Sequence, residues 1–260
     1  MGIAGAAIAT VLSQAVSAIL VLLALIRTSD IYKLHLRKVR FFEGSLSSIL
    51  RIGIPAGLQA AMYSLSNIII QTALNALGTD TVAAWTSFGK MDAFCWMVIS
   101  AFGISATTFV GQNYGAGKYD RVRKSVRVCL GMTLASSIAM SIFLMTAGKY
   151  LFHLFTSDPE VIRIGIQILN YMAPAYALFV FIEIYSGALR GIGDVIIPTI
   201  MTCCGVCVFR TLWVFLLVPK SPTIETITLS YPISWGITAV LFIIYYYKKQ
   251  KKLGMENFDQ

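Results

Sequence analysis

Four charged residues lie inside long apolar stretches of this chain, and such residues could bind or move a charged ligand. They are Lys90, Asp92, Glu183 and Arg210. A charge at the centre of a bilayer costs about 2.5–3.5 kcal/mol, so residues of this kind are functional candidates. Asp92 is the clearest case, because helical spacing puts aromatic and apolar side chains on its face. These side chains are Trp85, Phe88, Trp96 and Ile99.

An acid among aromatic rings suits an organic cation. The rings attract the cation through their negative faces, and the carboxylate of Asp92 supplies the counter-charge. The alternative role for Asp92 is a salt bridge with Lys90. Residues two apart point to nearly opposite sides of a helix, which favours the cation site.

Glu183 is the second candidate acid. Its helical face carries Met172, Tyr176, Phe179, Gly187 and Arg190. Pro174 lies two to three turns before it and predicts a kink in this helix. Glu183 could bind an ion, or it could pair with Arg210 of the following stretch and only stabilise the fold. The residues alone leave both roles open.

A polar stripe runs through the second apolar stretch at a strict spacing of four residues. Its members are Gln59, Tyr63, Asn67, Gln71 and Asn75. Four-residue spacing places them on one helical face, and that face cannot point at lipid. We expect it to join neighbouring helices or to line a wet cavity.

The elements that position these residues are membrane-spanning helices. Hydrophobic residues make up 57% of the 260 residues and charged residues only 13%, so a soluble fold could not cover its surface. A bilayer core of about 30 Å needs roughly 20 apolar residues. The sequence therefore predicts an all-α, polytopic membrane protein with about seven transmembrane helices. They are expected near 3–26, 50–77, 82–110, 126–151, 164–189, 195–218 and 226–247.

Charge distribution predicts the orientation of the chain. The net charge is +9, but the 21 lysines and arginines are not gathered as a nucleic-acid-binding patch. Sixteen of them fall in segments that alternate helices place on one side, and three fall on the other. By the positive-inside rule, the N-terminus is outside and the C-terminus is cytoplasmic, in a multi-pass protein of the cell membrane.

The five cysteines predict neither disulfides nor a metal site. All five fall inside expected helices. Cys203, Cys204 and Cys207 are close in sequence, but no histidine is near to complete a tetrahedral zinc site. We expect no metal, no catalytic machinery and no enzyme activity.

The organisation is one helix followed by six. We expect a first helix at 1–26, a basic cytoplasmic linker at 27–49, a six-helix lobe at 50–252 and a cytoplasmic tail at 253–260. One odd helix before a bundle of six is natural if the chain is the end of a longer protein with two six-helix lobes.

Several strings resemble the multidrug and toxic compound extrusion (MATE) transporters. Gly-Gln-Asn-Tyr-Gly-Ala-Gly-Lys at 111–118 is similar to the element between the second and third helices of that family's C-terminal lobe. Residues 2–10, 53–59 and 186–194 resemble its sixth helix, its seventh helix and the end of its tenth helix. The resemblance implies that the first five of twelve helices, and so most of the N-terminal lobe, are missing here.

The resemblance also implies a function. MATE transporters export cationic, drug-like compounds by alternating access, coupled to protons or sodium, with no other cofactor. They commonly carry an acid in the tenth helix, where Glu183 lies. Several members have an acid in the seventh helix where this chain has Met62, Tyr63 and Ser64, which shifts weight to Asp92 and Glu183.

We therefore expect substrate or ion binding by nine residues: Gln59, Tyr63, Asn67, Lys90, Asp92, Trp96, Tyr176, Glu183 and Arg210. Expected partners are cationic small molecules, the lipid bilayer and the missing lobe, without nucleic acid. Three alternatives remain. A lipid-linked oligosaccharide flippase should have more arginine in its cavity, a truncated fragment would be inactive, and a heptahelical receptor should carry an Asn-Pro-x-x-Tyr pattern that the last helix lacks.

Overall fold

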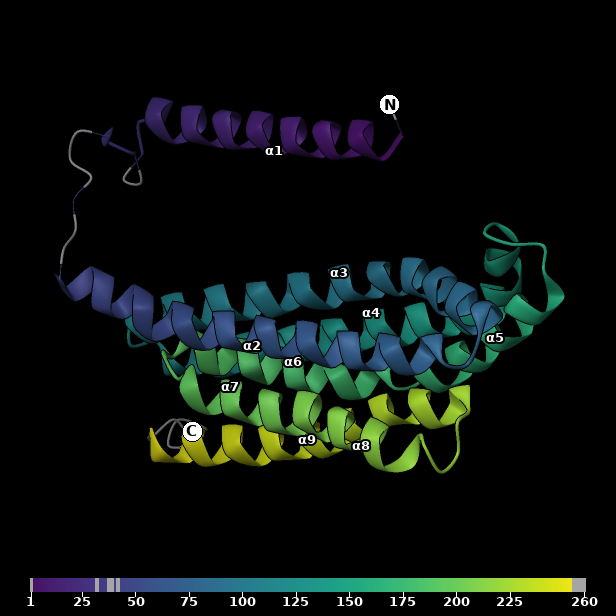
Figure 1. Cartoon of the computed structure of the whole chain (residues 1–260). Helices are drawn as coiled ribbons and strands as arrows, with labels where there is room; N and C mark the ends of the chain where they lie inside the picture. The colour runs from purple at the N-terminus through teal and green to yellow at the C-terminus, as the bar shows by residue number, and fades with distance from the viewer. Residues whose placement is uncertain (1, 31–32, 37–39, 41–42, 254–260) are drawn as a thin grey trace. The chain divides into compact units, whose positions relative to one another are not determined.

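The computed structural model describes residues 2–30, 33–36, 40 and 43–253. Every regular element in these ranges is a helix, as the sequence predicts (Figure 1). The chain divides into two compact units, 1–49 and 50–260.

The first unit contains helix α1 (Gly2–Arg27). Its stretch Ala7–Arg27 is long and apolar enough to cross a membrane, and side chains such as Val11 are exposed within the unit. The expected linker at 27–49 is irregular over residues 28–30, while residues 31–32, 37–39 and 41–42 lie outside the described ranges. Its last seven residues are already part of the helix that begins at Glu43.

The second unit holds the remaining helices, which follow one another as expected. They are α2 (Glu43–Asn75, beginning in the first unit), α3 (Thr79–Gly115), α4 (Tyr119–His153), α5 (Pro159–Met172), α6 (Tyr176–Gly191), α7 (Ile196–Thr202), the π-helical turn η2 (Cys203–Val208), α8 (Phe209–Leu217) and α9 (Ile224–Lys252). The expected tail lies outside the described residues from position 254 onwards.

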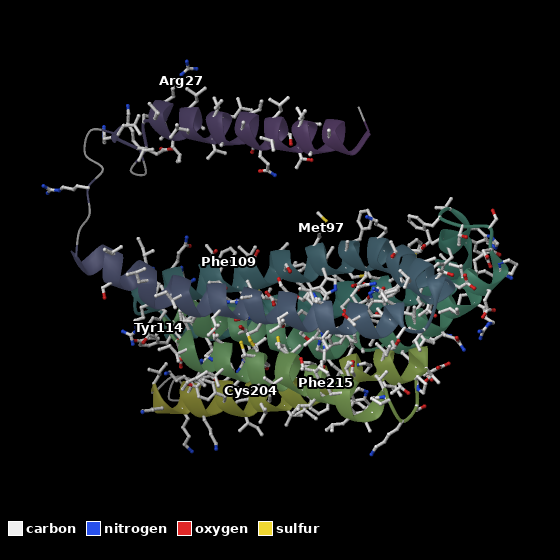
Figure 2. All side chains as sticks on the ribbon, viewed as in Figure 1. Arg27, Met97, Phe109, Tyr114, Cys204 and Phe215 are labelled. Carbon is white, nitrogen blue, oxygen red and sulfur yellow. The ribbon has the colours of Figure 1, made fainter. Side chains whose placement is uncertain are left out.

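Most of these helices meet the length and apolarity of a membrane span. Among the described residues, five helical stretches do so, counting α1 of the first unit and taking α7 to α8 as one stretch, and α5 with α6 makes a sixth as one bent span. The exposed surface is apolar as lipid requires, with side chains such as Met97 and Phe215 pointing outward (Figure 2). Helix α2 has 33 residues but is not among these spans, because amides such as Gln59, Asn67 and Gln71 interrupt its apolar sequence.

The kink predicted at Pro174 is present. Helices α5 and α6 meet at an angle of 50° across residues 173–175. Proline has no N–H to donate and its ring clashes with the carbonyl one turn earlier, so the helix cannot continue straight. The Ser141 hydroxyl of α4 donates to the Ala173 carbonyl oxygen at 2.6 Å, which satisfies one backbone group at the break.

The sixth predicted stretch is one helix with an irregular middle. Helices α7 and α8 run into one another through the π-helical turn η2. A π turn carries one residue more per hydrogen-bonded ring than an α-helix does. A Cβ added at Gly205 in this turn would collide with the Thr238 hydroxyl, so α9 packs directly on the turn.

Glycines allow α3 and α6 to approach closely. A Cβ at Gly187 would lie 2.6 Å from the Gly103 carbonyl oxygen, and one at Gly191 would lie 2.7 Å from the Thr107 carbonyl oxygen. Such small residues at four-residue spacing are typical of helix pairs in membranes.

The element between α3 and α4 begins later than the string at 111–118 indicates. Gly111, the first residue of that string, still lies inside α3. The turn begins after Gly115, where Gly117 adopts a φ of +69°.

Candidate functional site

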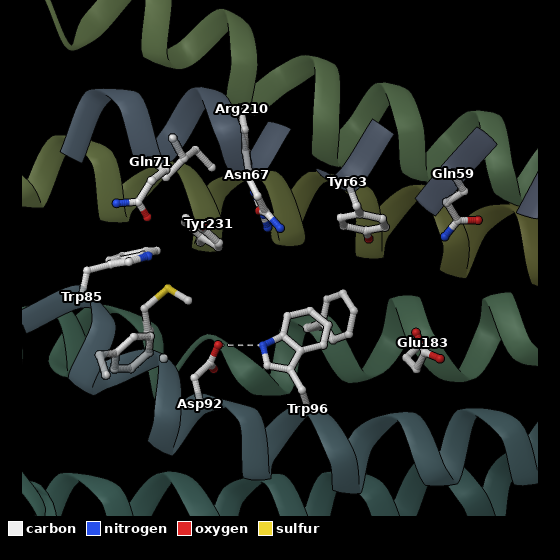
Figure 3. A pocket seen from close by; sticks show the side chains of 15 residues that line it. Gln59, Tyr63, Asn67, Gln71, Trp85, Asp92, Trp96, Glu183, Arg210 and Tyr231 are labelled. Carbon is white, nitrogen blue, oxygen red and sulfur yellow. Dashed lines mark hydrogen bonds between the residues drawn. The ribbon is translucent and has the colours of Figure 1, made fainter. Parts of the chain in front are cut away.

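The polar stripe of α2 forms one wall of a cavity of about 510 Å³. Gln59, Tyr63, Asn67 and Gln71 all line it (Figure 3). The fifth member, Asn75, does not line the cavity, and its amide oxygen accepts a hydrogen bond of 2.9 Å from Gln71. The stripe is therefore mainly a cavity lining, and only its end acts as a link between polar side chains.

The facing wall brings together residues that are far apart in sequence. Asp92 and Trp96 come from α3 and Glu183 from α6, while Arg210 of α8 enters the cavity from the side of α2 (Figure 3). The fold thus places seven of the nine predicted site residues on one cavity. The exceptions are Tyr176, which lies behind the lining, and Lys90.

Lys90 faces a different part of the unit. Its side chain is exposed and lines an apolar groove between α3 and α4, beside Phe94 and Leu154. The prediction that Lys90 belongs with Asp92 at one site is not what the structure shows. The reason is the two-residue spacing, which turns the two side chains to different faces of α3.

Asp92 accepts one hydrogen bond on each carboxylate oxygen. Trp96 donates from its indole Nε1 to Oδ2 at 2.8 Å, and the Tyr176 hydroxyl donates to Oδ1 at 2.5 Å. Trp96 follows one turn later on the same helix, whereas Tyr176 is the first residue of α6 after the Pro174 break. Hydrogen bonds to charged groups are worth about 1.5–3 kcal/mol each. The break therefore brings in a donor that fixes the orientation of the carboxylate.

Glu183 has a partner on its own helix. Its carboxylate oxygen Oε1 is 3.5 Å from Nη2 of Arg190, two turns later. The alternative pairing with Arg210 is not present, because the Arg210 guanidinium is directed to α9. The wall of α3 is close behind Glu183, since a Cβ at Gly103 would collide with the Glu183 carboxylate.

Arg210 is the most deeply buried charge of the site, with 3% of its surface exposed. Its guanidinium carbon is 3.8 Å from the centre of the Tyr231 ring, and its Nε donates to the Ser234 hydroxyl at 3.1 Å. Its buried Nη2 has no hydrogen-bond acceptor among the described residues. Stacking on Tyr231 compensates part of the lost solvation, and Figure 3 shows the side chain pointing into the cavity. An acceptor carried by a ligand could satisfy the remaining donor.

Around the predicted site residue Trp96, the cavity has an aromatic cluster whose other members were not among the nine predicted site residues. Trp96 and Phe179 have ring centres 4.4 Å apart, and Phe179 lies 5.3 Å from Trp235. Tyr231 contacts both Trp235, at 5.7 Å, and Trp85, at 5.8 Å. The sequence carried a signal for part of this cluster, because Tyr231 and Trp235 are four residues apart and so share a face of α9.

The cysteines of η2 do not all face one site. Cys204 is exposed while Cys207 is buried, so the two face different surroundings. Across the part of the chain that the structure describes, no three histidine, cysteine or acidic side chains come together in a way that could hold a metal ion.

Comparison with known proteins places this geometry in a family. A sequence profile described as MatE matches residues 55–216, which is more than half of the chain. The chain is 25% identical over 265 residues to the "Probable multidrug resistance protein YoeA" of Bacillus subtilis, covering 100% of this chain and 57% of that protein. It is 26% identical over 211 residues to the human "Multidrug and toxin extrusion protein 1", covering 79% of this chain and 36% of that protein.

Solved structures show the same fold. A multidrug resistance MATE family transporter in an outward-facing conformation matches with a TM-score of 0.88 at 21% identity, over 98% of this chain and 57% of that one. A transporter of the same superfamily from Pyrococcus furiosus, described as having reverse polarity of its binding pocket, matches with a TM-score of 0.87 at 21% identity, again over 98% of this chain and 57% of that one. The chain thus spans little more than half the length of the proteins it matches. On the profile match, with the fold in agreement, this multi-pass membrane chain belongs to the MatE family of transporters.

Proposed function

We propose that this chain is the C-terminal lobe, with one preceding helix, of an antiporter that exports organic cations in exchange for protons or sodium. The observation that carries the proposal is Asp92, whose two oxygens are held by Trp96 and Tyr176 at the wall of an aromatic-lined cavity. Names of the relatives refer to multidrug resistance and to toxin extrusion, which agrees with a cationic, drug-like cargo.

The cavity has the size and lining that such a cargo needs. Its volume of about 510 Å³ lies within the range of about 300–1,000 Å³ that small-molecule sites occupy. Flat rings of Trp85, Trp96 and Tyr231 offer apolar contact and cation–π attraction. The amides of α2 on the other wall can bond polar groups of different cargoes without demanding one shape.

Exchange follows if cargo and coupling ion compete for the acids. A bound cation neutralises Asp92 or Glu183, and so does a proton or a sodium ion, so each expels the other. Alternating access then requires a second lobe to close the cavity from the other side. Because the chain spans at most 57% of the relatives named above, that lobe has to come from the rest of the protein or from a separate chain.

One alternative has less support from the cavity. A flippase for a pyrophosphate-linked oligosaccharide needs several cations, whereas Arg210 is the only arginine or lysine among the described lining residues, beside two acids. Membership of the MatE family likewise argues against the heptahelical receptor. The experiment below decides whether the chain is an inactive fragment.

The test is made in a protein in which this chain is joined to, or co-expressed with, a complementary N-terminal lobe. Asp92→Asn and Glu183→Gln keep the size of each side chain and remove its charge. Glu160→Gln is the matched control, because Glu160 is an exposed acid paired with Arg163 at 2.6 Å and does not line this cavity. Ethidium efflux and the amount of folded protein are measured together.

We expect Asp92→Asn and Glu183→Gln to abolish efflux, because a cationic cargo that loses its charged partner binds more weakly by about 3–5 kcal/mol. The amount of folded protein should stay normal in both variants. Glu160→Gln should keep efflux. Full efflux in both Asp92→Asn and Glu183→Gln would eliminate these acids as coupling sites. If the unsubstituted protein itself shows no efflux, the chain is an inactive fragment.

A further inference from the structure

A second cavity, of about 680 Å³, lies outside the central one, between α3 and the beginning of α4. Its floor is apolar, and Phe109, Val128 and Met132 of this floor are each about half exposed, with fractions of 54%, 48% and 53%. Phe109 is labelled in Figure 2, where its side chain points away from the ribbon. We refer to this cavity as the α3–α4 groove.

Basic and polar groups line one end of the α3–α4 groove. Arg121 and Lys124 lie one turn apart at the start of α4, and both are exposed. Neither has an acidic partner among the residues that the structure describes. Their neighbour Arg123, in contrast, is buried and bound to Asp120 at 2.7 Å. Arg121 and Lys124, which have no such partner among the described residues, thus both line the groove.

Asn113 completes this polar end. It belongs to the string at 111–118 that the transport site does not use. Its amide nitrogen donates to the Phe109 carbonyl oxygen at 2.7 Å, which holds the side chain at the lip of the groove. Ser125 of α4 also lines the groove. Two cations, an amide and a hydroxyl at one end of an apolar trough make a site for a phosphate ester with a hydrocarbon chain.

We infer that the α3–α4 groove binds one anionic phospholipid, with its phosphate on Arg121 and Lys124 and an acyl chain along Phe109, Val128 and Met132. Charge complementarity selects the headgroup, because basic pockets between transmembrane helices attract anionic lipids. The apolar floor selects a lipid over a soluble phosphate, since the floor is buried only when a chain covers it. This inference is independent of the cargo of the central cavity.

The same two helices provide an internal comparison. The apolar groove that contains Lys90, described above, lies between α3 and the end of α4. It has a similar volume, about 670 Å³, but Lys90 is the one basic residue among its described lining residues. Ser87 lines that groove as Ser105 lines the α3–α4 groove. Each of these hydroxyls donates to the carbonyl four residues earlier in α3. A bulky replacement at either serine therefore breaks the same kind of hydrogen bond but fills a different groove.

The experiment uses the 260-residue chain in nanodiscs of phosphatidylcholine that contain a phosphatidylglycerol probe with a photoreactive diazirine in one acyl chain. Mass spectrometry measures the yield of crosslinks on peptides of α3 and α4. The double variant Arg121→Gln with Lys124→Gln should lower the yield at this groove roughly tenfold. Ser105→Phe, which fills the groove and keeps both charges, should lower it to a similar extent.

Two controls should keep the wild-type yield at the α3–α4 groove. Ser87→Phe fills the other groove, and Lys251→Gln with Lys252→Gln removes two exposed charges at the end of α9. Circular dichroism checks that each variant keeps its helical content. If the double charge variant is unfolded, the crosslink yields of Arg121→Gln alone and of Ser105→Phe decide whether the groove binds the lipid. Unchanged yield in the charge variant overturns the inference. A wild-type crosslink yield in Ser105→Phe would also overturn it, because the lipid would then be attracted only by surface charge. The inference is equally overturned if soluble glycerol phosphate competes with the probe as well as unlabelled phosphatidylglycerol does.

Discussion

Replacing Gly187 by alanine should destabilise the second unit, because the added methyl group meets backbone instead of a side chain. The nearest atom would be the Gly103 carbonyl oxygen at 2.6 Å, followed by the Thr107 hydroxyl oxygen at 3.1 Å. A side chain could rotate away, but the carbonyl can only move with α3. The contact between α3 and α6 would therefore have to open, and this contact positions Asp92 and Glu183 around one cavity.

The size of the effect follows from a matched control. Gly131 also lies inside a helix, α4, but a Cβ there has no atom within 4 Å. Both replacements gain about 0.5–1 kcal/mol from the better helix propensity of alanine. Only Gly187→Ala also incurs overpacking, which costs about 1–3 kcal/mol. The difference between the two variants is then the overpacking cost itself, about 1–3 kcal/mol.

The assay is reversible unfolding of the purified chain in mild detergent, followed by tryptophan fluorescence and circular dichroism. Gly131→Ala should unfold at the same or slightly higher denaturant concentration than wild type, and Gly187→Ala at a lower one. Gly191→Ala should resemble Gly187→Ala, because its nearest atom is the Thr107 carbonyl oxygen at 2.7 Å. Equal stability of Gly187→Ala and Gly131→Ala would refute the close approach of α3 and α6.

Three other outcomes are expected. Tyr176→Phe should lower the free energy of unfolding by about 1.5–3 kcal/mol, through loss of a bond to a charged group, whereas the exposed Tyr171→Phe should not; additive effects of Tyr176→Phe and Asp92→Asn would show that the two residues do not interact. In a background without native cysteines, an impermeant thiol reagent added outside cells should label Ser221→Cys and miss Lys118→Cys, and the reverse pattern would overturn the orientation. The chain expressed alone in an efflux-deficient host should give no drug resistance, because no second lobe closes the cavity; resistance above background would instead point to a dimer that supplies both lobes.

Much of the fold could be predicted because lipid imposes simple rules. Apolar length gave the helices, and Pro174 gave the bend, since both depend on local sequence. The close approach of α3 and α6 depends on four-residue pairs such as Gly187 and Gly191, a visible pattern that the prediction passed over. The π turn before Arg210 had no such signal, because its hydrogen bonding depends on packing against α9.

The site was predictable only where one helix decides it. Asp92 and Trp96 are four residues apart on α3, so their contact follows from helical geometry. The bond from Tyr176 crosses 84 residues and depends on how α6 packs. Glu183 does not follow this limit, because its partner Arg190 lies on the same face of the same helix, although the pairing was expected with Arg210 of the following stretch. Lys90 was included for its charge, although its position on the helix already turned it away.

The π turn at Cys203–Val208 makes the aim of Arg210 a matter of chain register. One residue more in a turn rotates every later side chain by about 100° relative to an uninterrupted α-helix. Converting the turn to regular α-helix without changing the number of residues would swing Arg210 away from Tyr231, whereas deleting one residue within the turn would restore the regular helix and keep Arg210 in its present direction. Migration of the turn along the helix past Arg210 would swing it by the same angle without breaking the membrane crossing. The location of this one backbone irregularity thus decides which side chain the helix presents to the cavity.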